Sequence, residues 1–178
     1  ASLEFRADAK AEGDCVALGG WLCHPDGPSA SPWYKLRLDR KSAPWAFRSG
    51  EPFRTIASLE LFATLLCIKA FGVQSDVHSG TVCTLSAQPL KGLTDNKGNA
   101  HAVAKMLTTK FPLCAFLMEI AATLEKIRMP LSLYWIPREQ NVEADELSNE
   151  ISHRFDPKLE VKVDLSNMGF LVLDDLLD

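Results

Sequence analysis

Four carboxylic acids stand in segments where an unpaired carboxylate would be destabilising. Glu60 is the sole charged residue in the apolar segment 55–68, and Asp145 lies beside the apolar stripe of a predicted short helix. Asp8 and Asp95 follow two segments that are predicted as strands. A buried carboxylate needs a hydrogen-bond donor, a cation or a metal ion. The simpler alternatives are an Arg or Lys partner for Glu60 and an exposed position for Asp145.

If these four side chains converge, their mutual repulsion favours binding of hard divalent cations. The set contains carboxylates alone, without His or Cys, and this chemistry suits Mg²⁺ or Mn²⁺ better than zinc. Two such ions, about 3.5–4 Å apart, can activate a water and stabilise the leaving oxygen in phosphodiester hydrolysis. The acids therefore predict a Mg²⁺ site, at which Mn²⁺ could substitute.

The elements that carry the first acid are predicted from alternating apolar and polar residues. Three strands are expected, at Leu3–Ala7, Cys15–Cys23 and Trp33–Leu38. Residues 9–14 are expected to form a polar turn, which places Asp8 at the end of the first strand.

The other acids are carried by later elements. Pro52–Phe71 is apolar nearly all round and predicts a central helix bearing Glu60. Thr81–Leu85 and Leu90–Thr94 are alternative candidates for the fourth strand, and the second leads directly into Asp95. Helices are then expected at Ala100–Met106, with Asn96 or Asn99 at its start, and at Pro112–Arg128.

The fourth acid belongs to the closing segments of the pattern. Leu131–Ile136 predicts a strand between two prolines, and Asn141 is a candidate N-cap for the helix of Asp145. Val142 and Leu147 are expected to face inward on that helix. After it, Leu159–Val163 alternates like a strand, and 170–178 is apolar and acidic. We expect this end to dock on the domain's own helices.

Composition is that of a soluble α/β domain, with 178 residues of which 47% are hydrophobic and 24% charged. The five cysteines form no CxxC pair, which favours an intracellular, reducing compartment, either nuclear or cytoplasmic. No apolar run is long enough to span a bilayer, so no membrane association is expected.

The net charge of −4 is unevenly distributed along the chain. Residues 139–178 carry a balance of −8, whereas residues 1–138 carry +4. The most basic stretch runs from Lys35 to Arg54 and includes Arg37 and Lys41. Such a stretch is a candidate contact for nucleic-acid phosphates, and a solvated face is the alternative.

Taken in order, the acids and their neighbours resemble the ribonuclease H domain of retroelement reverse transcriptases, over about residues 3–149. The motifs are FRADA around Asp8, LEL around Glu60, TDN around Asp95, and WIP followed by NVEADELS around Asp145. The last two are most similar to DIRS-like elements with a tyrosine recombinase.

This resemblance implies a five-stranded mixed sheet of order 3-2-1-4-5, flanked by helices, and a catalytic domain at 1–149 with a C-terminal extension at 150–178. It implies that Asp8 bridges two Mg²⁺ ions, with Glu60 and Asp95 completing one site and Asp145 the other. The implied substrate is the RNA strand of an RNA–DNA hybrid. The implied partner is the rest of a larger polymerase polyprotein.

Substrate binding is expected at Thr55, which matches a position that contacts the DNA phosphate in cellular members. The full expected substrate-binding set is Arg37, Lys41, Arg54, Thr55 and Asn96. Two features depart from the family: Ile56-Ala57 replaces a polar Asn pair, and the loop 138–140 lacks a His. The alternatives are therefore a non-catalytic scaffold of this fold, or a nuclease of the same fold for another nucleic acid. The presence of all four acids argues against the scaffold.

Overall fold

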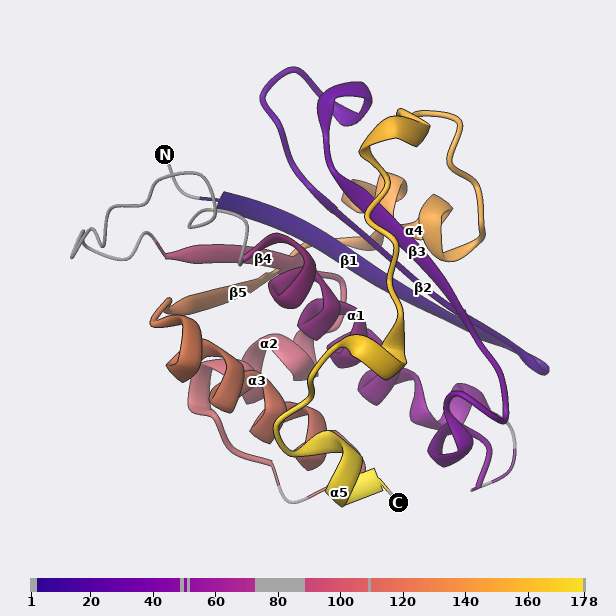
Figure 1. Cartoon of the computed structure of the whole chain (residues 1–178), viewed down its shortest axis with the longest axis vertical. Helices are drawn as coiled ribbons and strands as arrows, with labels where there is room; N and C mark the ends of the chain where they lie inside the picture. Colours follow the sequence, from indigo (N-terminus) through magenta and orange to yellow (C-terminus); the bar gives the residue numbers. More distant parts are fainter. Residues whose placement is uncertain (1–2, 49, 51, 73–88, 109, 178) are drawn as a thin grey trace.

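The computed structural model describes residues 3–177 except 49, 51, 73–88 and 109. Its centre is a five-stranded mixed sheet of order β3-β2-β1-β4-β5, which confirms the predicted order (Figure 1). β2 pairs antiparallel with β1 and β3, whereas β4 pairs parallel with β1 and β5. The strands are β1 (Leu3–Glu12), β2 (Cys15–Leu22), β3 (Trp33–Leu38), β4 (Leu90–Thr94) and β5 (Leu131–Trp135).

β1 is longer than the sequence pattern predicted. The strand continues past Ala7 to Glu12, and its pairing with β2 runs without interruption to Glu12↔Cys15. Gly13 has a φ of 59°, a left-handed conformation that allows a two-residue turn to close the hairpin. The predicted turn at 9–14 is therefore wrong, and Asp8 lies within the strand rather than at its end.

Helices cover both faces of this sheet. Gly19 and Gly20 are successive residues of β2 and point to opposite faces. A Cβ at Gly19 would lie 2.5 Å from Leu147 Cβ in α4 (Val142–Ser148), and one at Gly20 would meet Cys67 of α1. The glycines thus let α4 approach one face and α1 (Ile56–Phe71) the other.

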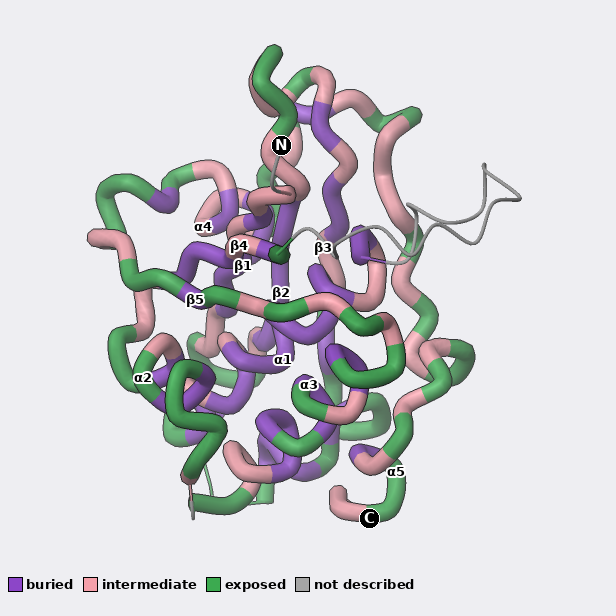
Figure 2. Tube along the Cα trace, turned by 90° about the vertical axis from the view of Figure 1, so that its left-hand side faces the viewer, coloured by how far each residue is buried: buried purple, intermediate pink, exposed green. Residues whose placement is uncertain are grey.

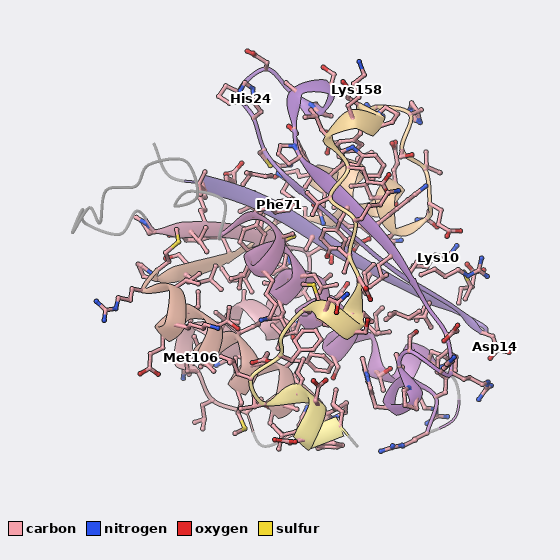
Figure 3. The ribbon with its side chains drawn as sticks, in the orientation of Figure 1. Lys10, Asp14, His24, Phe71, Met106 and Lys158 are labelled. Atoms are coloured by element: carbon pink, nitrogen blue, oxygen red, sulfur yellow. The ribbon has the colours of Figure 1, made fainter. Side chains whose placement is uncertain are left out.

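α1 is the buried centre of its layer, as its apolar sequence predicted. It packs on β1 and β2 and also contacts α2 (Lys97–Lys105) and α3 (Leu113–Ile127). Figure 2 shows α1 and the inner strands largely buried. The predicted helix 52–71 begins with a 3-10 turn, Pro52–Thr55, before the α-helix. A helix buried on most sides is held by packing, so its position relative to the sheet is well determined.

The remaining predicted elements are mostly found, with shifted ends. Leu90–Thr94 is the fourth strand, and the alternative at Thr81–Leu85 lies outside the described residues. α2 begins at Lys97 rather than at residue 100, because the Asn96 side chain caps it by accepting from the Asn99 N–H at 2.9 Å.

In its described residues, 150–177, the C-terminal extension forms no strand, so the prediction at Leu159–Val163 is wrong. A single bridge joins Glu160 to Trp33, and the Val161 N–H donates to the Trp33 carbonyl at 2.7 Å. Beyond this bridge the chain leaves the edge of β3 and crosses to the layer of α1 and α3, where it forms α5 (Leu173–Leu177) (Figure 1). The alternating apolar and polar residues of 159–163 therefore belong to a segment that passes over the edge of the sheet, and they do not form a paired strand.

Both halves of the extension bury aromatic or aliphatic side chains. Phe155 packs between Trp21 and Trp33, with ring centroids 5.7 and 5.6 Å away. Phe170 lies 6.1 Å from Phe62 of α1, and Leu173 is 2% exposed. Burial of such side chains is worth roughly 1.5–3 kcal/mol each, so the extension is part of the packed structure. A functional division at residue 149 stays a prediction.

None of the helices within the described ranges is long and apolar enough to cross a membrane. The cysteines in the described ranges are free thiols, at Cys15, Cys23, Cys67 and Cys114.

Candidate metal centre

The four predicted acids meet where β1 and β4 part. These two strands pair only from Leu3↔Leu90 to Arg6↔Leu93. Asp8 lies two residues farther along β1, and Asp95 follows the end of β4. In open α/β sheets a crevice forms where neighbouring strands diverge at their carboxyl ends. The strand geometry therefore places both carboxylates at the mouth of such a crevice.

Three of the acids form a tight cluster. Asp8, Glu60 and Asp95 each offer one carboxylate oxygen, and these oxygens all lie within 4.8 Å of one another. Glu60 reaches the cluster from the second turn of α1. Asp8 is only 4% exposed, whereas the other two are half-buried. The spacing is short enough for one cation to contact all three.

Asp145 lies beside this cluster rather than within it. It lines the same pocket, whose volume is about 620 Å³, and its charge contributes to raising the pKa of Asp8. Arg138 Nη2 is 3.7 Å from Asp145 Oδ1. The described lining residues are Asp8, Ala9, Lys10, Ala11, Glu12, Ile56, Glu60, Asp95, Asn96, Arg138, Asp145 and Asn149.

Burial and mutual repulsion disfavour the charged forms of these acids. Burial raises the pKa of Asp8 to about 8, with further contributions from the charges of Asp95 and Asp145. Burial likewise raises the pKa of Glu60 to about 8, and the charges of Asp95 and Asp8 add to it. The cluster cannot be fully ionised near neutral pH without a compensating cation.

Asp8 and Glu60 also each accept a side-chain hydrogen bond that favours the charged form of the carboxylate. Ser148 Oγ donates to Asp8 Oδ2 at 3.1 Å, and Asn96 Nδ2 donates to Glu60 Oε2 at 2.7 Å. Both contacts lower the corresponding pKa, although burial outweighs them. The donors fix the orientation of the carboxylates and leave other oxygen lone pairs open to a ligand.

The donor set fits a hard divalent cation. It consists of carboxylate oxygens, the ligands that Mg²⁺ and Mn²⁺ prefer. In the part of the chain that the structure describes, no Lys or Arg forms an ion pair within 4.0 Å of Asp8, Glu60 or Asp95. A protein cation therefore does not occupy the place that a metal ion would take.

α4 begins at Val142 and follows Asn141, as predicted, but the contacts of these two residues differ from the prediction. Asn141 makes no capping hydrogen bond; instead its Nδ2 donates to the Ala7 carbonyl at 3.1 Å, next to Asp8. Val142 is 41% exposed, contrary to the prediction, whereas Leu147 is fully buried. α4 is short, and Ala144, Leu147 and Ser148 already fill the face that meets the sheet. Asn141 is thus an anchor that holds α4 against β1.

Sequence reasoning missed several residues of this pocket. Asn149, the residue after α4, lines the pocket, and its Nδ2 donates to the Asp145 carbonyl at 2.8 Å. Ser148 is not in the described lining, but its Oγ donates to Asp8. Lys10 lies two residues after Asp8, so the strand period of two could have placed it on the same face. No periodicity in the sequence could have placed Arg138 at the pocket, because its position depends on the path of the loop.

The predicted substrate-binding residues divide between two places. Asn96 lines the acid pocket. Arg37 and Lys41 instead line a second cleft of about 640 Å³, bounded partly by the extension, and Arg37 Nη1 lies 3.8 Å from Glu150 Oε2. The structure therefore does not bring Arg37 and Lys41 to the acids.

Thr55 and Arg54 lie at the start of α1, near the acids in sequence but not lining their pocket. Thr55 is buried, and its Oγ1 donates to the Pro52 carbonyl at 2.8 Å, whereas Arg54 is exposed. The roles of all five residues in substrate binding stay predictions.

Comparison with known proteins reveals similarity in structure alone. No family model and no curated protein matches the sequence. Among solved structures, LC11-RNase H1, isolated from compost by a metagenomic approach, aligns with a TM-score of 0.61 at 19% identity, covering 85% of this chain and 95% of that chain. A structure of LC11-RNase H1 in complex with an RNA/DNA hybrid aligns with a TM-score of 0.55 at 18% identity, covering 85% and 96%. The chain therefore has a ribonuclease H-like fold.

Proposed function

We propose that this protein is a metal-dependent endoribonuclease that hydrolyses the RNA strand of RNA–DNA hybrids. The observation that carries the proposal is the convergence of Asp8, Glu60 and Asp95, whose oxygens lie within 4.8 Å of one another at the crevice of the sheet. The fold likeness to LC11-RNase H1, one structure of which holds an RNA/DNA hybrid, supports the choice of substrate.

In this proposal Asp8, Glu60 and Asp95 would hold one Mg²⁺, and Asp8 with Asp145 would hold a second. Bound divalent ions supply Lewis acidity, which lowers the pKa of a bound water and stabilises a leaving oxygen. The chain's own contribution is orientation: Ser148 and Asn96 hold the carboxylates of Asp8 and Glu60 by hydrogen bonds.

The backbone of Asp95 is held by a hydrogen bond from Trp135. Trp135 Nε1 donates to the Asp95 carbonyl at 3.1 Å, which ties the end of β4 to the end of β5. The described pocket lining contains no histidine, so no imidazole is placed there to carry a proton away. We expect proton release directly to solvent through the open pocket, and a slow turnover.

A same-fold nuclease with another nucleic-acid substrate is the second candidate. Ile56 lines the pocket at the start of α1, where an apolar side chain cannot donate to or accept from a 2′-hydroxyl. Selection of the RNA strand would then rest on the shape of the duplex and on contacts to its backbone. The substrate panel below separates the two candidates.

The test is incubation with labelled RNA–DNA hybrid, duplex RNA, duplex DNA and single strands, each with Mg²⁺, Mn²⁺ or EDTA. Cleavage of the RNA strand of the hybrid in Mg²⁺ or Mn²⁺, and its absence in EDTA, is expected. Cleavage of another substrate in preference to the hybrid would support the second candidate. No cleavage of any substrate would favour a non-catalytic scaffold.

We further propose that the domain works within a retroelement reverse transcriptase polyprotein, in a reducing intracellular compartment. The motifs around Asp95 and Asp145 support this context. Co-purification of the domain with polymerase activity from its host cell would test it, and isolation as a free protein would contradict it.

A further inference from the structure

Arg138 is a cation at the rim of the acid pocket that the proposed chemistry does not yet use. It lies on the link between β5 and α4 and lines the pocket. Its Nη2 is 3.7 Å from Asp145 Oδ1, and its side chain is 79% exposed. The guanidinium thus makes one long contact to a candidate metal ligand and otherwise faces solvent.

The backbone beneath Arg138 is firmly held, although its side chain is not. Arg6 Nη1 of β1 donates to the Gln140 carbonyl at 2.7 Å. The Asn141 N–H donates to the Arg138 carbonyl at 3.0 Å, and the Asn141 side chain is itself bound to Ala7. The loop therefore holds the base of Arg138 at a constant position relative to β1 and Asp8.

Of the cations that line the described pocket, Arg138 is the one that pairs with a candidate metal ligand, Asp145. The cations in the described lining are Lys10 and Arg138, and Lys10 Nζ lies 3.6 Å from Glu12. An exposed pair with a single contact is weak. A divalent ion bound to Asp145 would therefore replace the guanidinium readily.

We propose that Arg138 positions the substrate: when a divalent ion occupies Asp145, the guanidinium leaves that carboxylate and binds a phosphate of the nucleic acid at the site. A guanidinium is suited to this role because its planar donors bind phosphate bidentately. This proposal rests on the proposed nuclease function.

The chain supplies a matched control in a second Arg that pairs with an acid of α4. Arg154 Nε and Nη2 donate to Glu146 Oε2 and Oε1 at 2.9 and 3.1 Å. Glu146 is the residue after Asp145, but neither Glu146 nor Arg154 lines the acid pocket. Replacement of Arg154 therefore removes an Arg paired with α4 without changing the charges that line the pocket.

The experiment compares Arg138→Gln, Arg138→Lys and Arg154→Gln in the full chain. Mg²⁺ alone is titrated by calorimetry, and binding of a labelled RNA–DNA hybrid is measured in Ca²⁺ over a range of salt concentrations. In Arg138→Gln, Mg²⁺ should bind several-fold more tightly because a competing cation is gone. Hybrid binding should weaken about tenfold, and the slope of log K against log salt should fall by about one.

The other two variants give graded expectations. Arg138→Lys keeps the charge and should keep the salt slope, but it should bind the hybrid less tightly because an ammonium is not bidentate. Arg154→Gln should leave both the Mg²⁺ affinity and the salt slope at wild-type values.

Wild-type Mg²⁺ affinity together with a wild-type salt slope in Arg138→Gln would overturn the proposal. Tighter Mg²⁺ binding with an unchanged salt slope would overturn the phosphate contact. Failure of the proposed nuclease function would appear separately, as absence of cleavage by the wild type. The Mg²⁺ titration reports on Arg138 in either case.

Discussion

Two sets of buried carboxylates in this protein are compensated in opposite ways. Glu119 of α3 is fully buried, and its Oε1 accepts from the Leu171 and Val172 N–H groups at 2.6 and 3.4 Å. These two donors lie directly before α5, so Glu119 holds this part of the extension in place. Asp8 accepts from Ser148 and from the backbone N–H of Ala9, and Glu60 accepts from Asn96; each of the two also faces two other acids.

The difference separates a structural carboxylate from a candidate ligand. The charge of Glu119 interacts with Lys69 of α1, whose pKa it raises against the larger lowering caused by burial. Asp8 and Glu60 face Asp95 instead of a cation, and their pKa values rise. Glu119 is thus compensated in part by the chain itself, through two backbone N–H donors at Oε1, although its buried Oε2 has no hydrogen-bond partner among the described residues. The carboxylates of the acid pocket, in contrast, are open to a ligand. Four measurements test this difference between Glu119 and the acid pocket.

The largest effect is expected from Asp8→Asn. Cleavage should fall roughly a thousandfold or more, about 4 kcal/mol of transition-state stabilisation, because a shared metal ligand is lost. The metal-free protein should be as stable as the wild type or more stable, since a repelled buried charge is removed. Steady-state cleavage and urea unfolding in EDTA measure the two quantities. Wild-type activity in Asp8→Asn would rule out the site.

Glu119→Ala should have the opposite profile. The free energy of unfolding should fall by about 3 kcal/mol, because two backbone donors lose their acceptor and the extension loses its anchor. Calorimetric Mg²⁺ affinity should not change. Glu125→Ala, at an exposed position of the same helix, is the control. A melting temperature equal to that of the wild type would show that Glu119 does not hold the extension.

The pH dependence of stability should reveal the acid pocket. The folded-state pKa values of Asp8 and Glu60, about 8, lie above their ordinary values of 3.8 and 4.5. Between these limits the folded state binds more protons than the unfolded state, so stability is greatest at low pH and is lost as pH rises toward 8. In EDTA, the free energy of unfolding should fall by several kcal/mol between pH 5 and pH 8, because each raised pKa contributes about 1.4 kcal/mol per pH unit over most of this interval.

Two controls accompany this pH series. Asp8→Asn should flatten the profile, because one of the two raised groups is removed. Mg²⁺ at a hundredfold excess over its dissociation constant should restore about 2.7 kcal/mol at pH 8. A metal-free profile that does not change between pH 5 and pH 8 would contradict the repulsion within the pocket.

The smallest effect is expected from Lys69→Met. Lys69 is near Glu119 but forms no ion pair with it within 4.0 Å, and its Nζ lies 5.3 Å above the Phe170 ring. The free energy of unfolding should change by no more than about 1 kcal/mol, measured by urea titration. A loss as large as that of Glu119→Ala would mean that the ammonium, rather than the backbone donors, compensates Glu119.

Much of the fold could be predicted because its elements have strong local patterns. The alternation in β1, β2 and β3 and the apolar length of α1 are properties of short segments. Predictions failed where the conformation or the contacts of one segment depend on another segment. Leu159–Val163 alternates like a strand, yet only one bridge to β3 forms. Asn141 occupies the predicted N-cap position, yet its side-chain oxygen accepts no hydrogen bond from the helix, and its Nδ2 donates to the Ala7 carbonyl.

The amino-acid sequence alone defines which acids lie in or next to apolar segments and in what order they occur. Asp8, Glu60, Asp95 and Asp145 could be selected because a carboxylate in an apolar segment requires compensation. The sequence also determined the departures at Ile56 and at loop 138–140, since residue identity alone defines them.

The contacts between side chains of distant segments follow from the tertiary structure alone. Ser148 is 140 residues from Asp8 in sequence, and it donates to that carboxylate because α4 packs on Gly19 of the neighbouring strand. The same packing leaves Asp145 beside Arg138. Glu119 is the sole charged residue in the apolar segment 111–124, as Glu60 is in 55–68. The sequence does not reveal its partners, because they are backbone N–H groups, which every residue except proline has. Contacts between distant segments depend on packing, and local patterns do not encode packing.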